Sequence, residues 1–189
     1  MNFNDDIEKA LTVLLEGGII LYPTDTVWGL GCDARNEQAV ADIYSLKKRA
    51  DEKSVIILLA DEKDITKYVS EPDPKIFDYV KGIGKPTTVI YEGAAGLAKN
   101  LANNDGSIAI RIVKDAFCAA LINRFGFPIV STSANISGYP APAIFNDIDI
   151  LIKNGVDYIV QHRQDDLRES APSAIVKWNA DGSISIIRP

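Results

Sequence analysis

The feature that most constrains the fold of this chain is a short apolar run that ends abruptly at a proline. Residues 19–22 read Ile-Ile-Leu-Tyr, a pattern typical of a strand buried on both faces. Pro23 ends the run, because proline has no backbone donor and a fixed φ. The polar residues 24–26 (Thr-Asp-Thr) follow at once, and then Trp28 with two glycines that allow a sharp turn. Polar groups in this position indicate either a ligand site at the end of a sheet strand or a turn that satisfies its own backbone.

The bulk composition predicts one globular domain over residues 1–189. Hydrophobic residues make up 47% of the chain and charged residues 24%, which is ordinary for a domain with a substantial core. No apolar run approaches the roughly 20 residues that span a membrane. The first residues lack the basic start and apolar stretch of a signal peptide, so we expect a cytoplasmic protein with no membrane partner.

Several classes of site are disfavoured by what the chain contains. Cys32 and Cys118 are the only cysteines, too few for a disulfide framework. The single histidine, His162, argues against a Ser-His-Asp hydrolase and against a histidine-rich metal site, so no metal held by protein side chains is predicted. The net charge of −6 provides no protein-wide positive field for a nucleic acid. Anion binding must therefore come from local clusters.

The order of the expected elements predicts the fold class. Apolar periodicity predicts helices over residues 5–16, 37–47, 64–68, 74–81, 116–124 and 148–153. Strand patterns occupy residues 19–22, 54–60, 87–91, 107–112, 128–131, 158–160, 174–178 and 183–187. Strands and helices alternate without regular βαβ units, and the last third is mostly strand. The prediction is an α/β fold with a twisted, mixed sheet flanked by helices.

A local cluster of cations follows the second predicted helix. Lys47, Lys48, Arg49 and Lys53 fall within seven residues, just before a buried strand. Such a cluster indicates a phosphate clamp, in which arginine binds a phosphate or carboxylate through two donors and lysine acts as a point charge. A solvated helix end has the same composition, because cations are favourable near the negative end of the helix dipole.

A second polar cluster, residues 131–138, reads Ser-Thr-Ser-Ala-Asn-Ile-Ser-Gly and follows another predicted strand. Its hydroxyls and carboxamide suit a ribose, a phosphate edge or an amino acid, although a loop that satisfies its own backbone is the simpler interpretation. The chain contains neither a Gly-x-x-x-x-Gly-Lys-Ser/Thr loop nor a Gly-x-Gly-x-x-Gly motif after a strand. We expect the two polar strand ends to open on the same side of the sheet.

Taken in order, the motifs resemble those of the YrdC-like family of threonylcarbamoyl-AMP synthases. The resemblance rests on residues 22–30 (Tyr-Pro-Thr-Asp-Thr-Val-Trp-Gly-Leu), on 46–49 (Leu-Lys-Lys-Arg) with Lys53, and on 133–138 (Ser-Ala-Asn-Ile-Ser-Gly). It extends through residues 84–90, 108–111, 173–176 and 187–189, and therefore covers essentially the whole chain. It implies a twisted α/β fold with a concave, positively charged groove.

The resemblance also implies an activity with defined substrates. Members of the family join L-threonine, bicarbonate or CO2, and ATP into threonylcarbamoyl-adenylate with release of pyrophosphate, and Mg2+ accompanies ATP. A downstream threonylcarbamoyl-transfer complex then modifies certain tRNAs. The synthase reaction has two steps, attack of the threonine amine to give a carbamate and attack of the carbamate oxygen on the α-phosphorus of ATP. Neither step needs an enzyme nucleophile, so catalysis consists of positioning and stabilisation of phosphate charge.

Roles for individual residues are carried over from the family motifs. Lys47 and Arg49 would hold the phosphates and the carboxylate end of the adduct, with Lys53 closing the phosphate site. Thr26, Arg111 and Ser173 would line the threonine pocket. The residues expected to face the nucleotide are Ser133, Asn135 and Arg188.

The chain departs from the family pattern in two places and leaves other interpretations open. Gly82-Ile83 stands where the family usually has Trp-Pro, and Ser173-Ala174 replaces a frequent pair of hydroxyl residues, which puts ligand contact at position 174 in doubt. A YciO-like paralogue, which lacks the full Lys-x-Arg plus Ser-x-Asn set, is the nearest alternative. A double-stranded-RNA or tRNA binding module without synthase activity is the other, and the acidic net charge argues against it.

Overall fold

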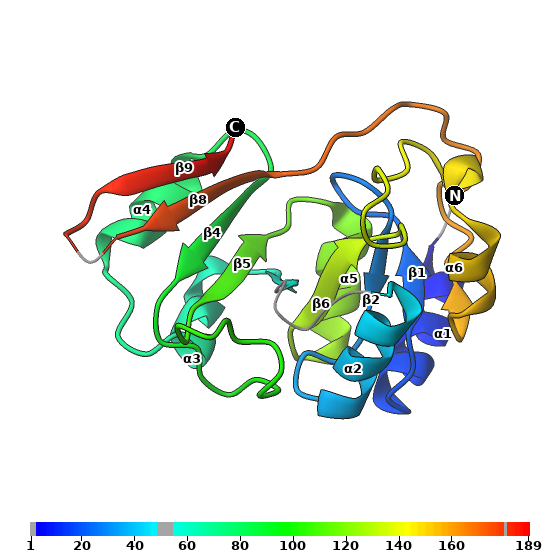
Figure 1. Cartoon of the computed structure of the whole chain (residues 1–189), viewed down its shortest axis with the longest axis horizontal. Helices are drawn as coiled ribbons and strands as arrows, with labels where there is room; N and C mark the ends of the chain where they lie inside the picture. The colour runs from blue at the N-terminus through cyan, green and yellow to red at the C-terminus, as the bar shows by residue number, and fades with distance from the viewer. Residues whose placement is uncertain (1–2, 49–54, 180) are drawn as a thin grey trace.

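The strands of the protein form one mixed sheet in a computed structural model that describes residues 3–48, 55–179 and 181–189 (Figure 1). Within these residues the spatial order is β7-β1-β2-β6-β3-β5-β4-β8-β9. In chain order the strands are β1 (Ile20–Tyr22), β2 (Gly29–Gly31), β3 (Ile56–Leu59), β4 (Thr87–Tyr91), β5 (Ile108–Ile112), β6 (Ile129–Ser133), β7 (Tyr158–Ile159), β8 (Ala174–Trp178) and β9 (Ile184–Arg188). Parallel and antiparallel pairs alternate irregularly, which confirms the predicted mixed α/β sheet.

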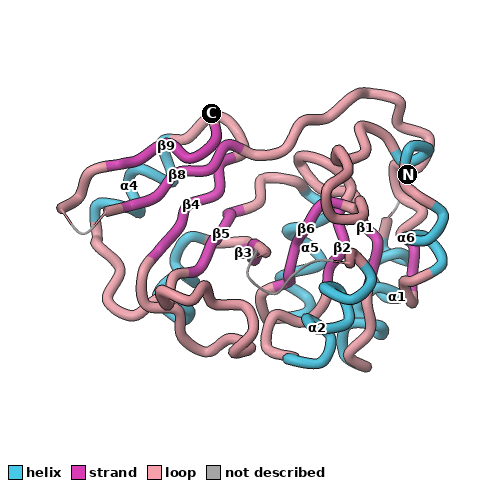
Figure 2. Tube along the Cα trace, viewed as in Figure 1, coloured by secondary structure: helices cyan, strands magenta, loops and turns pink. Residues whose placement is uncertain are grey.

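Helices flank this sheet along its length (Figure 2). They are α1 (Asn4–Leu15), α2 (Glu37–Leu46), α3 (Ile65–Tyr68), α4 (Lys75–Gly82), α5 (Ala116–Phe125) and α6 (Ile150–Asn154), with short 3-10 turns at η1 (Glu62–Asp64) and η2 (Phe145–Asp147). Local signals set their ends. The Asn36 side chain accepts hydrogen bonds from two backbone amides at the start of α2, and Gly126 ends α5 in the left-handed conformation.

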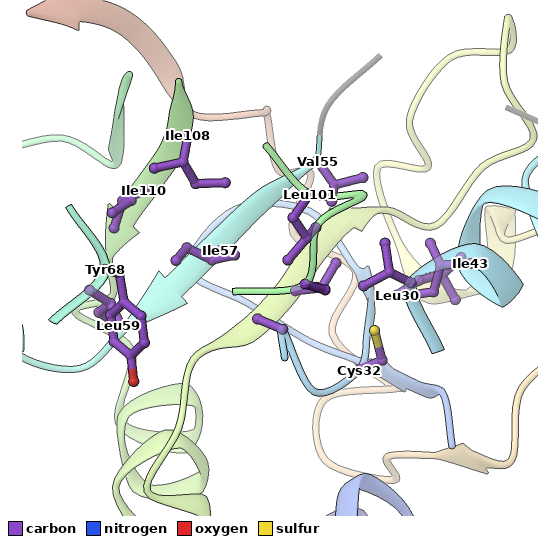
Figure 3. Packing of buried hydrophobic residues seen from close by; sticks show 14 of the residues in the cluster. Leu30, Cys32, Ile43, Val55, Ile57, Leu59, Tyr68, Leu101, Ile108 and Ile110 are labelled. Atoms are coloured by element: carbon purple, nitrogen blue, oxygen red, sulfur yellow. The ribbon is translucent and has the colours of Figure 1, made fainter. Parts of the chain in front are cut away.

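The strand register separates the core into two faces. On one, called here the α2 face, Leu30, Val130, Ile57 and Ile110 belong to a single buried cluster with residues of α2. Figure 3 shows Leu30, Ile57 and Ile110 of this cluster. On the other, the α5 face, apolar residues of β1, β3 and β6 pack against α1 and α5. On the α5 face, helices α1 and α5 cover strands β1, β3 and β6. Polar side chains occupy the neighbouring part of the same face, over strands β5, β4 and β8. The candidate site lies there.

Strand β2 was not predicted. The sequence indicated a sharp turn at Gly29 and Gly31, but both glycines lie inside a strand paired with β1 and β6. A Cβ atom at Gly31 would stand 2.7 Å from the ring of Tyr22 and 2.9 Å from the Val130 carbonyl oxygen. Gly31 is therefore required by close packing in a strand, where glycine is otherwise unfavourable, whereas a Cβ at Gly29 would lie 3.2 Å from its nearest neighbour, the Ser131 hydroxyl.

Two other boundaries differ from the prediction. Ser131, Thr132 and Ser133 belong to β6 and do not form a loop after it. The predicted strand 54–60 shortens to Ile56–Leu59, and Ser54 lies outside the described residues. In contrast, the strands predicted at 87–91 and 174–178 are confirmed at both ends. Among the described residues, no helix has the length and apolar character needed to cross a bilayer.

Candidate functional site

A cavity of about 360 Å³ lies on the α5 face, and we call it the arginine cavity. It is lined by Thr26, Val27, Gly29, Val55, Ile56, Arg111, Ser131, Thr132, Ser133, Asn135, Tyr139, Ala141, Pro172, Ser173, Ile175 and Arg188. These residues come from the loop after β1 and the start of β2, the start of β3, the second half of β5, the end of β6 and the loop after it, β8 with the segment before it, and the end of β9. The volume lies within the range of small-molecule sites, roughly 300–1,000 Å³.

The site begins with a hydrogen-bonded chain that orients Arg111. Arg111 is 2% exposed, and its Nη1 donates to Thr26 Oγ1 at 2.9 Å. Thr26 Oγ1 lies 2.9 Å from Thr24 Oγ1, which donates to the Val27 carbonyl oxygen at 2.8 Å. Arginine can only donate, and the single hydroxyl hydrogen of Thr24 goes to Val27, so the order of donation runs from Arg111 through Thr26 to Thr24. The hydroxyl of Thr26 is thus fixed at the cavity wall.

Asp25, which does not line the cavity, balances the charge of Arg111. Its Oδ1 lies 3.1 Å from Arg111 Nη2, and both side chains are largely buried. The Nε of Arg111 is buried without a hydrogen-bond partner. The ion pair therefore neutralises and holds one end of the guanidinium while a donor remains unused.

Arg188 is the second cation of the cavity. Its Nε donates to the Ser173 carbonyl oxygen at 2.9 Å, and the Ser173 hydroxyl lies 2.8 Å from that of Thr88. Burial, and then the nearby charge of Arg111, lower the pKa of Arg188 below its ordinary value. The two guanidinium groups therefore lie close enough for their charges to interact.

The end of β6 supplies the polar edge of the cavity. The Nδ2 of Asn135 donates to the Ile136 and Tyr139 carbonyl oxygens, at 3.0 and 2.7 Å. Its Oδ1 is buried and accepts no hydrogen bond within the described part of the chain. This oxygen is an acceptor for a ligand N–H or O–H, because a buried acceptor without a partner is unfavourable.

Lys47 holds the backbone at this edge of the cavity in place. It is 1% exposed, and its Nζ donates to the carbonyl oxygen of Ser133 and, at 2.6 Å, to that of Asn135. Its own carbonyl oxygen accepts from Ser137 N at 2.8 Å. The side chain therefore ties the end of α2 to the loop after β6, and it is not one of the lining residues of the cavity.

The charges of the cavity point to an anionic ligand. Arg111 and Arg188 are the only charged side chains among the described lining residues, and both are cations. Arg111 has Asp25 as a counter-charge, whereas Arg188 forms no ion pair with a described residue. Carboxylates and phosphates suit such a pair, because guanidinium groups bind them with two parallel hydrogen bonds.

The structure brings most of the predicted site residues together. Around the arginine cavity lie Thr26, Arg111, Ser133, Asn135, Ser173 and Arg188. Lys47 touches the same edge through hydrogen bonds to two backbone carbonyls. The predicted clamp residues Arg49 and Lys53 lie outside the described residues. What each residue binds stays a prediction.

Sequence reasoning missed two contributors to the site. It noted Asp25 in the polar run after β1 but assigned it no role, although Asp25 is the partner of Arg111. Tyr139 follows the polar cluster 131–138 in sequence and was given no role, yet it lines the cavity. The signal for Tyr139 was an aromatic side chain directly after the serine–asparagine cluster. No local signal links Asp25 to a residue on β5.

The two cysteines have the character of core residues. Burial raises the pKa of both thiols, and the Cys118 thiol donates to the Pro23 carbonyl oxygen at 3.3 Å. A protonated, buried thiol is a poor nucleophile. Neither residue lines the arginine cavity.

Comparison with known proteins identifies the class to which this fold and site belong. The sequence model of the Sua5/YciO/YrdC family, described as "Telomere recombination", matches residues 12–189. The chain belongs to the Sua5/YciO/YrdC family.

Individual relatives are consistent with this assignment. A protein of Xanthomonas euvesicatoria pv. vesicatoria named threonylcarbamoyl-AMP synthase is 33% identical over 186 residues, which cover 91% of this chain and 97% of that protein. The structure of P. abyssi Sua5 complexed with L-threonine matches with a TM-score of 0.84 at 23% identity, over 97% of this chain and 53% of that one. E. coli YciO matches with a TM-score of 0.83 at 20% identity, over 99% and 89% of the two chains. At these identities, the two structures show the fold alone.

Proposed function

We propose that this chain is a threonylcarbamoyl-AMP synthase. It would make threonylcarbamoyl-AMP, pyrophosphate and water from L-threonine, bicarbonate and ATP. The observation that carries the proposal is the paired guanidinium groups of Arg111 and Arg188 in a cavity whose described lining has no acidic residue. ATP and bicarbonate are anions and threonine carries a carboxylate, and the sequence relatives carry this enzyme name.

The proposed reaction has two steps, and neither uses an enzyme nucleophile. The threonine amine forms a bond to the carbon of CO2, or of bicarbonate with loss of water, and releases a proton to give a carbamate. A carbamate oxygen then attacks the α-phosphorus of ATP, and the bond to pyrophosphate breaks. The protein accelerates both steps by holding the reactants in line and stabilising phosphate charge.

The geometry supports specific roles for the cavity residues. Arg111, fixed by Asp25 and Thr26, would bind the threonine carboxylate, and Ser173 would complete that pocket. Arg188 would contact the phosphates. Asn135 Oδ1, which lacks a partner, would accept a hydrogen bond from the nucleotide.

The proposal also gives roles to the other residues of the family motifs. Ser133 would face the nucleotide, and Arg49 and Lys53 would complete the phosphate clamp. Lys47 would act there both as a cation and as the brace of the Ser133 and Asn135 carbonyls. Mg2+ would enter with ATP as part of the substrate. The product would pass to a threonylcarbamoyl-transfer complex that modifies tRNA in the cytoplasm.

The decisive experiment is mass spectrometry of the product after mixing the protein with threonine, bicarbonate, ATP and Mg2+. We expect threonylcarbamoyl-AMP and an equal amount of pyrophosphate, and neither product when threonine or bicarbonate is omitted. Serine should be a poor substrate and not an inert one, because one methyl contact contributes about 1–3 kcal/mol. Equal pyrophosphate release with serine, or with no amino acid, would contradict the proposed threonine pocket.

A further inference from the structure

A second cavity lies on the α2 face of the sheet and has a volume of about 470 Å³. It is lined by Val69, Ser70, Glu71, Pro72, Asp73, Ile76, Tyr91, Glu92, Gly93, Trp178 and Asn179, and we call it the acidic cavity. It lies where the loop between α3 and α4 meets the ends of β4 and β8, on the left of Figure 1. None of these residues lines the arginine cavity.

The charges of this cavity are all negative. Glu71, Asp73 and Glu92 are its acidic residues, and none of the described lining residues is a cation. Lys177, which is not a lining residue, reaches Glu92 at 3.6 Å. Neither Glu71 nor Asp73 forms an ion pair with a described residue. Most of the negative charge of the cavity is therefore not balanced by described residues, which favours a cationic ligand.

An aromatic wall stands beside the carboxylates. Trp178 Nε1 donates to Asp73 Oδ2 at 3.3 Å, and the Trp178 ring centroid lies 5.9 Å from that of Tyr79. The other oxygen of Asp73 accepts from Lys75 N at 2.9 Å. These contacts hold the indole and the carboxylate in place, so both are oriented before a ligand arrives. Indole is also the aromatic group that attracts cations most strongly.

The hydroxyl of a largely buried tyrosine opens into the cavity and points independently to a ligand. The Tyr91 side chain is 4% exposed and lines the cavity, yet its hydroxyl forms no hydrogen bond with any described residue. Burial alone raises the pKa of Tyr91, so the hydroxyl is neutral. The hydroxyl oxygen is not fully enclosed by protein, so it is open to the cavity and is paired by whatever fills that space. A ligand N–H group in the cavity would supply it.

We propose that the acidic cavity binds an alkylguanidinium group, presented as an arginine side chain on the surface of a partner protein. The planar guanidinium would pair with the Asp73 and Glu71 carboxylates, pack on Trp178 and donate to Tyr91 Oη, while its alkyl stem would contact Ile76 and Val69. Free arginine is disfavoured because its own carboxylate would meet the same three acidic residues. This proposal does not depend on the synthase activity.

The two tryptophans of the chain make a direct test possible, because each gives one indole resonance in a ¹H–¹⁵N spectrum. Trp178 reports on the acidic cavity, and Trp28, packed against Phe145, serves as an internal control. The probes are butylguanidinium, N-acetyl-L-arginine methylamide, free L-arginine, and butylurea as the neutral isostere of butylguanidinium. We expect butylguanidinium and the capped arginine to shift the Trp178 resonance saturably, free arginine to bind at least about threefold more weakly, and butylurea not to bind.

Matched variants assign the binding to the named groups. Asp73→Asn keeps an oxygen for the Trp178 indole but loses the charge, and it should weaken butylguanidinium binding by at least about fivefold. Tyr91→Phe should weaken it by about twofold or more. Asp42→Asn, an exposed carboxylate on α2, should leave it unchanged. Synthase activity should stay at the wild-type level in all three variants.

Three results would overturn the proposal. The first is a Trp178 shift with butylurea equal to that with butylguanidinium, and the second is an unchanged affinity in Asp73→Asn. The third is free L-arginine binding as tightly as the capped form, which would remove the assignment to a protein side chain. Each variant's spectrum also reports whether it is folded, so a misfolded variant cannot pass for a loss of binding.

Discussion

The two cavities of this molecule lie on opposite faces of one sheet and have opposite charge. The arginine cavity contains Arg111 and Arg188 and no acidic side chain among its described lining residues, whereas the acidic cavity contains three carboxylates and no cation. Both occur in a chain whose net charge is −6. The comparison teaches that net charge describes the whole surface, while the ligand preference of a site depends on the few charges that adjacent strands direct into it.

The cavities also differ in how their charges are balanced. Arg111 is held by a buried ion pair and a chain of hydroxyls, so its orientation is fixed within the fold. Glu71 and Glu92 in the acidic cavity are exposed, and only Asp73 is fixed by two hydrogen-bond donors. Substitutions in the arginine cavity should therefore affect stability and activity more strongly than matched substitutions in the acidic cavity.

The largest expected effect is that of Asp25→Asn on stability. The substitution leaves the buried charge of Arg111 without a counter-charge, close to a second cation. Breaking a buried ion pair costs about 3–5 kcal/mol, so we expect a loss of roughly 3 kcal/mol in the free energy of unfolding, measured with urea. Glu8→Gln, which breaks an exposed pair with Arg124, is the control and should change little. Equal effects of the two substitutions would contradict the difference between the cavity and the surface.

The next effect is that of Arg111→Lys on activity. Lysine keeps the charge but cannot contact Thr26, Asp25 and a substrate carboxylate through one planar group. We expect threonine-dependent pyrophosphate release to fall by at least about tenfold, since a charge-assisted hydrogen bond contributes roughly 1.5–3 kcal/mol. Arg124→Lys, an exposed arginine on α5, should retain wild-type turnover. Full activity of Arg111→Lys would rule out its proposed role.

A smaller effect separates two buried tyrosines on the two faces of the sheet. The Tyr22 hydroxyl donates to the Val130 carbonyl oxygen at 3.4 Å, whereas the Tyr91 hydroxyl has no partner among the described residues. Tyr22→Phe should therefore cost about 1 kcal/mol of unfolding free energy, and Tyr91→Phe should be neutral or stabilising within about 0.5 kcal/mol. Thermal and urea unfolding of both variants would measure this. A larger loss for Tyr91→Phe would indicate an internal partner and weaken the case for the acidic cavity.

The smallest effect concerns His162, whose ring lies 5.2 Å from that of Phe3 and 5.6 Å from that of Phe117 on the α5 face. Burial, and then the charge of Arg163, lower the pKa of His162 in the folded protein. The stability that its neutral form provides is therefore fully present above the unfolded pKa of about 6.5 and is lost as the pH falls through the lower folded pKa. We expect His162→Phe to lose less stability than the wild type between pH 7 and pH 5, measured by urea unfolding. Parallel pH profiles would contradict this assignment.

The local sequence pattern predicted most of the elements and the residues gathered at the arginine cavity. The strands at 87–91 and 174–178 were predicted at their true ends from their apolar and β-branched residues. Thr26 and Ser133, distant in sequence, were expected on one side of the sheet, and both line the same cavity. That expectation followed from polar residues placed directly after or at the end of buried strands.

Only the tertiary structure decided how those residues are used. Gly29 and Gly31 have the composition of a turn, yet they form a strand paired with β1, and at Gly31 the Tyr22 ring and the Val130 carbonyl oxygen leave no room for a Cβ atom. Asp25 pairs with Arg111, 86 positions away, although β2, β6 and β3 lie between β1 and β5 in the sheet, and no local pattern records that contact. Lys47 has the sequence of a solvated helix end or a clamp, yet its ammonium group is buried against two carbonyl oxygens. Periodicity along the chain reports whether a segment is buried, whereas the partner of a buried charge depends on which strands become neighbours, and that is set by the energy of the whole fold.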